Sequence, residues 1–467
     1  MYVYDLDDPL ARETLADLDN TAGAGCVRIL HIRPYVSSFH MRQEYKKKTK
    51  KVTWVSIKHR FSQCRRKGGR GTDREIRALL GNLRNLKNLE FLDIQCHLSD
   101  DIAAFRKTIP PIRVSWSSYS SCLRRLILKV PLECYEALLS PSIVFPRLSD
   151  LSVYIFAADY STNPVEPIRS ALVPFINQHV NSLESISIIT PETGTADLSP
   201  MFFNLKYFPR LSKLHLVFCA LSLDYINLTG LHEFFSAHST QLQDVVLHFN
   251  RMIGLKAQNF HSPTFFSLPV FRVAFPALRS LDLGFTGFRD STGQGTISYV
   301  HRFRERLSRL LLNHTQLSIG NVARLTNSFS SLRYLEIFVY HLSPTLLDLL
   351  STKLVHLEDL RITCICFSGS QGPFQSADDP ARTDKFCAEM SRRMYVDWAL
   401  RTLRTQVISK ATKNLPLCKR ALATSLPEVE TIDGLPRMSF LVEDTSNITH
   451  RSRWNLSVFE SDVPNLK

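Results

Sequence analysis

The sequence predicts an α/β solenoid, a curved stack of parallel strands joined by helical crossovers, and two observations carry this prediction. The first is a phrase that occurs three times: FPRLSDLSV at 145–153, FPRLSKLHL at 208–216 and FPALRSLDL at 275–283. The second is the broader pattern L-x-x-L-x-L, with Ile or Val allowed, at a mean spacing of just under 30 residues. Its ten copies begin at Leu89, Leu123, Leu148, Leu183, Leu211, Leu242, Leu278, Leu307, Leu332 and Leu357. Fixed periods of this size are typical of repeat architectures.

Each copy of the pattern predicts one strand. Alternate side chains of a strand point to opposite faces, so the last two apolar residues enter the core together. The first leucine enters the same core from the preceding turn. A single strand cannot bury this apolar face alone, whereas stacked copies form a continuous interior. An earlier copy, Val27-x-x-Leu30-x-Ile32, raises the expected number of strands to ten or eleven.

The segments between the strands read as helices. Apolar residues recur at three- and four-residue spacings in 167–183, 228–242 and 297–307, the period of a helix with one buried side. Proline lacks an N–H donor and disfavours helix for the residue before it. The Phe-Pro pair of the repeated phrase is therefore predicted to end a crossover and start a strand.

With this motif the chain resembles leucine-rich-repeat proteins of the F-box type, especially the divergent sets found in fungi. The resemblance covers about Val27 to Ile365. It implies that the repeats hold a protein substrate on their concave strand face, while an F-box docks on the adaptor of a cullin–RING ubiquitin ligase. Met1 to Gly25 contain no L-P-x-E-[IL] F-box pattern, so the resemblance concerns the substrate-binding part.

Composition restricts the location that we expect. No apolar run reaches the 18 or so residues of a membrane helix. The first twenty residues hold six acids against one base, Arg12, which is unlike a signal or transit peptide. The ten cysteines lack the regular spacing of a disulfide framework, as is usual in reducing compartments. These features predict a protein of the cytoplasm or nucleus without a membrane segment.

The sequence offers no catalytic site. It contains no G-x-x-x-x-G-K-[ST], H-E-x-x-H or G-x-S-x-G motif, which would mark phosphate binding, a zinc protease or a nucleophilic serine. The fifteen histidines are dispersed. We therefore expect a non-catalytic monomer with neither cofactor nor metal.

The net charge of +14 is concentrated in one insertion. From Arg42 to Arg77 there are fourteen Lys or Arg and three acids. One interpretation is a nuclear localisation signal, or a site for nucleic acid or anionic lipid, with Trp54 and Phe61 available for base stacking. A solvated disordered loop is favoured, because like charges repel; untrimmed non-coding sequence is a third alternative. We expect Gln43 to Gly71 to be dispensable for folding.

These patterns divide the chain into six segments. They are an acidic lead at 1–25, a first repeat-like strand at 26–40, the basic insertion at 41–75, the repeats at 76–367, a linker at 368–382, and a C-terminal helix and capping segment at 383–467. An amphipathic helix is predicted from Thr383 to Lys413, with an apolar stripe that includes Met390, Met394 and Trp398. It is expected to cap the last repeat, since solenoid ends need covering; gripping a partner is the alternative. Residues 425–435 resemble a degraded final repeat.

The outward strand positions are the candidate binding surface. Solubility alone favours polar residues there, yet large apolar residues occur on neighbouring repeats. We expect them to bind a protein partner, unless the C-terminal segment covers them or the register shifts. The candidate residues are Tyr154, Ile189, Val217, His215, His248, Phe338, Glu336 and Arg361.

Overall fold

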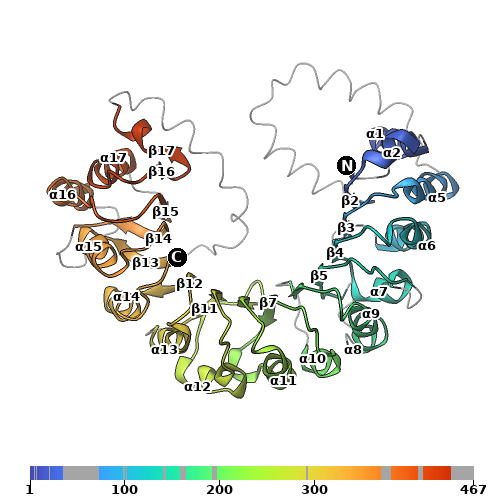
Figure 1. Ribbon diagram of the computed structural model, residues 1–467, viewed down its shortest axis with the longest axis horizontal. Helices are drawn as coiled ribbons and strands as arrows, with labels where there is room; N and C mark the ends of the chain where they lie inside the picture. Colours follow the sequence, from blue (N-terminus) through green and yellow to red (C-terminus); the bar gives the residue numbers. More distant parts are fainter. Residues whose placement is uncertain are drawn as a thin grey trace. The chain divides into compact units, whose positions relative to one another are not determined.

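The computed structural model describes residues 1–34 except 5, 7 and 20, and then 73–97, 100, 102–139, 143–157, 165–191, 197–290, 293–369, 380–408 and 414–442. Most of the predicted basic insertion and the last 25 residues lie outside these ranges. The chain forms two compact units, Met1–Leu242 with Asn250–Leu255, and Gln243–Phe249 with Lys256–Lys467. Each unit is a layer of strands with its helices on one side (Figure 1).

The first unit begins with seven strands in chain order, and each pairs in parallel with the next. The strands are β1 (Tyr2–Tyr4), β2 (Ile29–Arg33), β3 (Phe91–Gln95), β4 (Arg125–Lys129), β5 (Asp150–Tyr154), β6 (Ser185–Ile189) and β7 (Lys213–Ala220). The helical segments are α1 (Pro9–Ala16), η1 (Asp17–Asp19), α2 (Thr21–Cys26), α5 (Asp73–Gly81), η3 (Asn82–Asn85), α6 (Ile102–Tyr119), η4 (Leu132–Cys134), α7 (Tyr135–Leu138), α8 (Val165–Pro167), η5 (Ile168–Leu172), α9 (Val173–Gln178), α10 (Ser199–Asn204), η6 (Leu223–Tyr225) and α11 (Thr229–His238).

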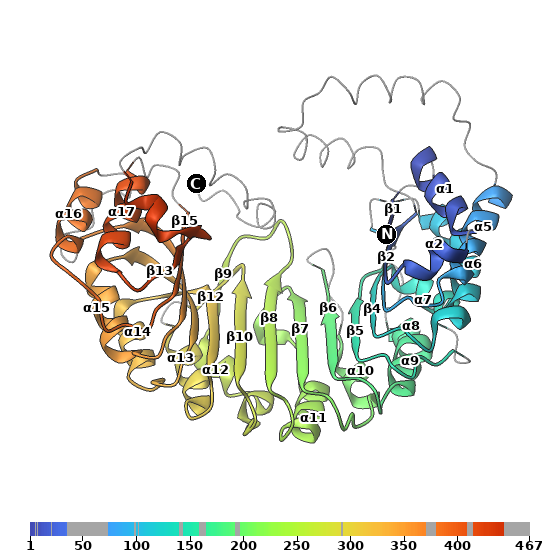
Figure 2. The same ribbon diagram turned by 45° about the horizontal axis from the view of Figure 1, so that its top comes forward.

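The second unit repeats this plan, with its helices again on one side of the strands (Figure 2), and it ends in a short antiparallel hairpin. Its main sheet has the order β8 (Asp244–Arg251), β10 (Ser280–Thr286), β12 (Arg309–Leu317), β13 (Tyr334–Leu342), β14 (Asp359–Phe367), β15 (Thr402–Val407), β16 (Thr431–Ile432) and β17 (Leu435–Pro436). A second small sheet pairs β9 (Gln258–Asn259) with β11 (Phe288–Arg289). The helical segments are α12 (Ser262–Phe266), η7 (Pro269–Arg272), α13 (Gln294–Val300), η8 (His301–Phe303), α14 (Ile319–Thr326), α15 (Pro344–Lys353), α16 (Pro380–Met390), α17 (Leu415–Ser425) and η9 (Arg437–Phe440).

The leucines of the motif form the core, as the pattern predicts. In the first unit Leu183, Ile186 and Ile188 retain none of their surface, and in the second unit the same is true of Leu357 and Leu360. Burial of side chains of this size contributes about 1.5–3 kcal/mol each, and this drives the strands to stack. The α/β solenoid prediction is confirmed.

Backbone hydrogen bonds between successive repeats also fix the edge at which the strands begin. The carbonyl of Arg124 accepts the N–H groups of Ser149 and Asp150, and the carbonyl of Glu184 accepts those of Ser212 and Lys213. In the second unit Arg279, Ser308, Arg333 and Glu358 accept in the same way from the next repeat. One carbonyl with two donors per repeat satisfies the polar backbone where the strand starts, and this keeps successive repeats in register.

The Phe-Pro joint has a partner that the sequence did not reveal. His179, at the end of α9, accepts the N–H of Phe145 through Nε2 at 3.0 Å and bonds the carbonyl of Phe175 through Nδ1 at 2.8 Å. His238, at the end of α11, likewise accepts the N–H of Phe208 through Nε2 at 2.9 Å. Each imidazole therefore holds the joint of the preceding Phe-Pro phrase from a later helix.

The parallel strands extend beyond the predicted eleven. The segment expected to be only an acidic lead contains β1, which pairs with β2 from Tyr2↔His31 to Tyr4↔Arg33. At the other end β15 pairs with β14, and β16 pairs with β15. Strand β16 lies in 425–435, the segment that resembles a degraded repeat.

The predicted helix from Thr383 to Lys413 is wrong beyond Met390. Helix α16 ends there, and β15 follows at Thr402–Val407. The predicted apolar stripe splits accordingly, because Trp398 is 3% exposed while Met394 is 62% exposed. Leu400 and Leu403 are buried as the first two leucines of another repeat. The chain leaves the helix because these leucines have a place in the sheet core, and burial outweighs helical periodicity.

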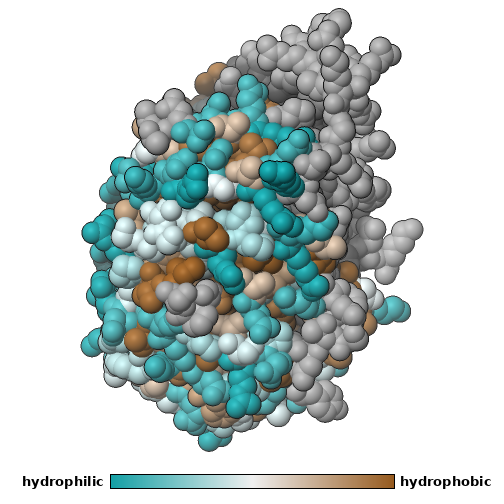
Figure 3. All heavy atoms as spheres, turned by 90° about the vertical axis from the view of Figure 1, so that its right-hand side faces the viewer, coloured by the Kyte–Doolittle hydropathy of each residue, from teal (hydrophilic) through white to brown (hydrophobic). Residues whose placement is uncertain are grey.

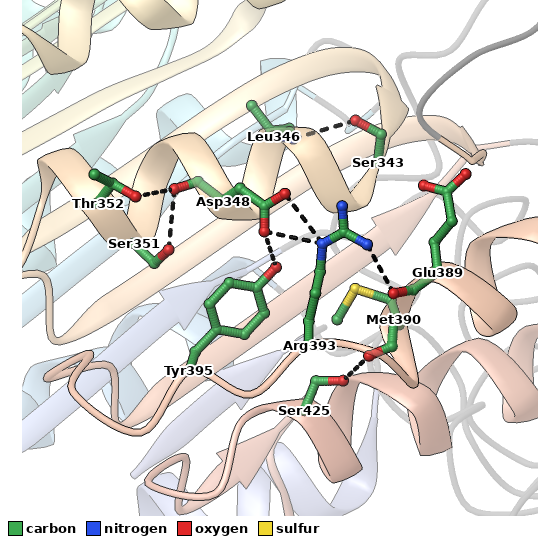
Figure 4. A network of polar contacts seen from close by, with 10 residues as sticks. All are labelled: Ser343, Leu346, Asp348, Ser351, Thr352, Glu389, Met390, Arg393, Tyr395 and Ser425. Carbon is green, nitrogen blue, oxygen red and sulfur yellow. Dashed lines mark hydrogen bonds and ion pairs between the residues drawn. The ribbon is translucent and has the colours of Figure 1, made fainter.

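The segment between α16 and β15 is fastened to α15 (Figure 4). Arg393 Nε donates to both carboxylate oxygens of Asp348 at 3.0 Å, and the Tyr395 hydroxyl donates to Oδ1 at 2.7 Å. Ser425 of α17 donates to the carbonyl of Met390 at 2.7 Å. These bonds, together with the buried indole of Trp398, place the C-terminal elements as an extension of the repeat stack.

Candidate functional site

The candidate site is the strand face, by which we mean the face of each strand layer opposite its helices. The helical side of the first unit, seen where α5 and α6 lie, is mainly hydrophilic with separate hydrophobic areas (Figure 3). Exposed apolar residues of that side, such as Leu10 at 65% and Val114 at 69%, belong to different helices. On the strand face, by contrast, pairing places outward side chains in continuous rows.

One such row in the first unit comprises Lys129, Tyr154, Ile189 and Val217, and we call it the first ladder. The register pairs Tyr154 with Ile189 and Ile189 with Val217. Lys129 Nζ lies 4.9 Å from the centre of the Tyr154 ring, a cation–π contact. The first three side chains are half-buried. Val217 is only 8% exposed, so it packs beneath the row and leaves little surface for a partner to contact.

Next to the first ladder lies a polar row at the preceding outward position. His215 pairs in register with Ser187, and its Nδ1 lies 3.2 Å from the serine hydroxyl. Further along, His31 Nδ1 is 2.9 Å from Asp93 Oδ2, and the same oxygen accepts from Gln95 at 2.6 Å. Tyr2 stacks on His31 with ring centres 4.5 Å apart. Sequence reasoning missed the contact between Tyr2 and His31 because β1 and β2 were not recognised as neighbours.

In the second unit His248 belongs to a compact cluster. Its Nε2 is 2.8 Å from Asp282 Oδ1, and its ring meets that of His314 edge-on at 5.2 Å. His314 Nδ1 lies 3.2 Å from the hydroxyl of Thr286. Gly284 lies beneath both rings, since a Cβ there would stand 2.6 Å from His314 and 2.9 Å from His248. Glycine is thus required by close approach at this position.

The electrostatics of this cluster keep His314 neutral. Burial and, to a lesser extent, the charge of His248 lower its pKa to about 4, and Asp282 opposes the shift. His314 reaches this place through an irregularity of β12. The register with β13 runs from Leu312↔Ile337 to Gln316↔Phe338, so the residues between them bulge. Because of this bulge the partner of Phe338, one of the candidate residues, is Gln316 and not Asn313, which uninterrupted pairing would place there.

Glu336, Phe338 and Arg361 come together with two residues that were not predicted, Arg309 and Tyr334. We call these five residues the second ladder. The guanidinium carbons of Arg309 and Arg361 lie 3.8 and 5.0 Å from the centre of the Tyr334 ring. The Tyr334 hydroxyl donates to Glu336 at 2.8 Å, and Arg361 lies 3.8 Å from the same carboxylate oxygen.

The second ladder is internally ordered before any partner arrives. Asn313 donates to the other oxygen of Glu336 at 2.8 Å. Burial and the adjacent Glu336 carboxylate raise the pKa of Tyr334, so its hydroxyl stays protonated and remains a donor. Phe338 is half-buried beside this network. The missed residues occupy the first outward position of each strand, and Tyr334 among alternating leucines was the available signal.

The described residues give no basis for metal chemistry or a membrane span. No group of three or more His, Cys, Asp or Glu side chains in these ranges could hold a metal ion. Within the same part of the chain, no helix is both long and apolar enough to cross a membrane.

The stacked L-x-x-L-x-L strands with helices on one side form a leucine-rich-repeat solenoid fold, and the comparisons with known proteins are as follows. No protein-family model matches the chain, and no curated protein matches it. Among solved structures, the leucine-rich-repeat-containing protein LegL7 from Legionella pneumophila is similar, with a TM-score of 0.33 and 13% identity over 61% of this chain and 94% of that one. A complex of TLR13 with ssRNA13 is similar with a TM-score of 0.28 and 13% identity, over 84% of this chain and 41% of the other.

Proposed function

We propose that the chain is a non-catalytic scaffold that binds a protein partner on its strand face. The observation that carries the proposal is the first ladder, in which a tyrosine and an isoleucine occupy adjacent, paired strand positions opposite the helices. The outward rows of a repeat protein form an extended surface suited to a macromolecule. Tyrosine and arginine, the prominent residues of the two ladders, are enriched among residues that dominate interface energy.

Order in the free protein favours such binding. Side chains that are already fixed lose less conformational entropy when a partner docks. Lys129 is placed against Tyr154, and the second ladder is fixed by the bonds around Glu336. The gain applies to each unit separately, because each ladder lies within one unit.

The second ladder suggests the chemistry of the partner. Arg309 of this ladder is exposed on the outward side of β12, and so is Arg404 of β15, which pairs in register with Arg361. Glu336 is already engaged by Tyr334 and Asn313. Guanidinium groups pair well with carboxylates. A partner segment with acidic side chains and an apolar group for the Phe338 region fits this part of the face.

The finer proposal is that the bound protein is a ubiquitination substrate. It rests on the resemblance to fungal F-box/leucine-rich-repeat receptors, which implies a cullin–RING ligase adaptor as a second partner and a place in the cytoplasm or nucleus. The alternative is a nuclear or nucleic-acid-associated protein that acts through 42–77, where the surplus of positive charge lies.

Affinity capture with matched variants tests the proposal. The change of Tyr154→Ser with Ile189→Thr removes the ring and one apolar group, whereas Tyr154→Phe with Ile189→Val keeps them. We expect the first pair to lose the partner, by 30-fold or more for roughly 2 kcal/mol of lost contact, and the second pair to retain it. Circular dichroism confirms that each variant is folded.

Val114→Ser, on the exposed side of α6, is the control for surface apolarity. Loss of the partner by this variant and retention by the strand-face pair would refute the proposal. Adaptor and cullin subunits in the captured material support the ligase assignment. Nucleic acid that is released by salt, and lost when Lys47, Lys48, Arg65 and Arg66 become Ser, supports the alternative.

A further inference from the structure

Two helices of the second unit bring a pair of thiols together. Cys387 lies on α16 and Cys418 on α17, and their sulfur atoms are 3.9 Å apart. The residues are 31 positions apart in the chain, and β15 lies between them in sequence. The cysteines were scattered in the sequence, so only the packing of α16 against α17 creates the pair.

The two thiols have different surroundings, and this assigns them different roles. Cys387 is partly exposed, whereas Cys418 is fully buried. The neighbouring Cys418 thiol lowers the pKa of Cys387, against the opposing effects of burial and Asp384. The pKa of Cys418 is raised by Cys387 and by burial. Cys387 is thus the thiol that ionises first and that a small solute can reach.

We propose that Cys387 and Cys418 form a reversible disulfide when a hydroperoxide oxidises the pair. The Cys387 thiolate attacks one peroxide oxygen and breaks the O–O bond, giving a sulfenic acid and, after protonation, water. The Cys418 sulfur then attacks the Cys387 sulfur, the S–O bond breaks, and the hydroxyl leaves as water with the Cys418 proton. Two thiols and one hydrogen peroxide become one disulfide and two waters.

The sulfur atoms need to approach by about 2 Å to reach bonding distance, a change within the range of side-chain rotation. The bond would tie α16 to α17 and close the chain around β15. Closure of such a loop restricts the unfolded chain and stabilises the folded one. The proposal is independent of partner binding, because the pair lies among the helices and away from the strand face.

The test treats the full chain with one to two equivalents of hydrogen peroxide, followed by digestion and mass spectrometry. We expect a peptide pair joined through Cys387 and Cys418, lighter by two hydrogens and separated by dithiothreitol. Oxidation should also raise the melting temperature of the wild type and of Cys122→Ser. The latter is a control with another partly exposed thiol. Cys387→Ala and Cys418→Ala should show no such rise.

Peptide mapping reads the bond directly, so a variant of reduced stability does not obscure the result. Sulfinic acid on Cys387 without a joined peptide would overturn the proposal. A disulfide from Cys418 to Cys364, a buried thiol of β14, would overturn it as well.

Discussion

At the scale of single residues, His179 and His238 show how one side chain fastens two repeats. Each imidazole must donate from Nδ1, because its partner there is a carbonyl, and must accept at Nε2 from a backbone N–H. Both rings are neutral in this arrangement. Burial lowers the pKa of each, and the bond to the carbonyl of Phe175 or Phe234 only partly opposes the shift.

This predicts that stability falls in mild acid. Above the ordinary histidine pKa of about 6.5, folded and unfolded chains are both neutral at these sites. As the pH drops below that value, these two histidines bind protons in the unfolded chain but remain neutral in the folded chain. The free energy of unfolding therefore decreases. Melting temperatures from pH 7.5 to 5 should fall less steeply when His179 and His238 are both changed to Gln.

The control for this experiment is His356→Gln, because His356 is exposed. Its pH dependence should match that of the wild type. An unchanged slope in the double variant would show that the two histidines do not titrate between the folded and unfolded states as described.

Single residues also mark how far the candidate site was predictable. Outward positions follow from the two-residue period, so the sequence predicted that Tyr154, Ile189, Glu336 and Arg361 lie on the strand face, where the pairings place them. That they bind a partner stays a prediction. The low exposure of Val217 depends on packing against neighbouring segments of the chain, and the sequence did not predict it. The bulge after Leu312 and the glycine beneath His248 and His314 arise from three-dimensional packing, for which one repeat carries no signal.

At the scale of elements, the repeats were predictable wherever the leucine motif is complete. The leucine pattern did not predict strand β15 because the motif is incomplete there. Leu400 and Leu403 are present, but Thr405 occupies the position of the last leucine. The Thr405 hydroxyl bonds Asp433 Oδ2 at 3.1 Å. Asp433 also meets Lys419 at 2.7 Å. A polar network thus replaces an apolar contact at the last repeats, which a leucine pattern does not detect.

The extension of the core beyond α16 is testable with one matched pair. Trp398→Ala should lower the free energy of unfolding of the second unit by about 3–5 kcal/mol, since it opens a cavity and leaves the carbonyl of Leu354 without its indole donor. Met394→Ala should change it by no more than about 0.5 kcal/mol, because Met394 is exposed. Chemical denaturation measures both. Equal effects would restore the single amphipathic helix.

At the scale of the molecule, both units place helices on one side of the strands (Figures 1 and 2). The register of the strands leaves rows of outward side chains on the other side. The fold class could be predicted from the sequence because the L-x-x-L-x-L motif occurs ten times. A wrong boundary or register in one copy therefore does not change the predicted fold. No repeated pattern indicates the function. It depends on the residues of the strand face, and these differ from repeat to repeat.

Site-specific photocross-linking tests the central claim, that the strand face binds a protein partner, most directly. A photoreactive residue in place of Ile189 probes the strand face, and one in place of Val114 probes the helical side of the same unit. With the partner recovered by affinity capture, we expect a cross-link from position 189, diminished by excess unlabelled chain, and none from position 114. A cross-link from position 114 alone would contradict the account.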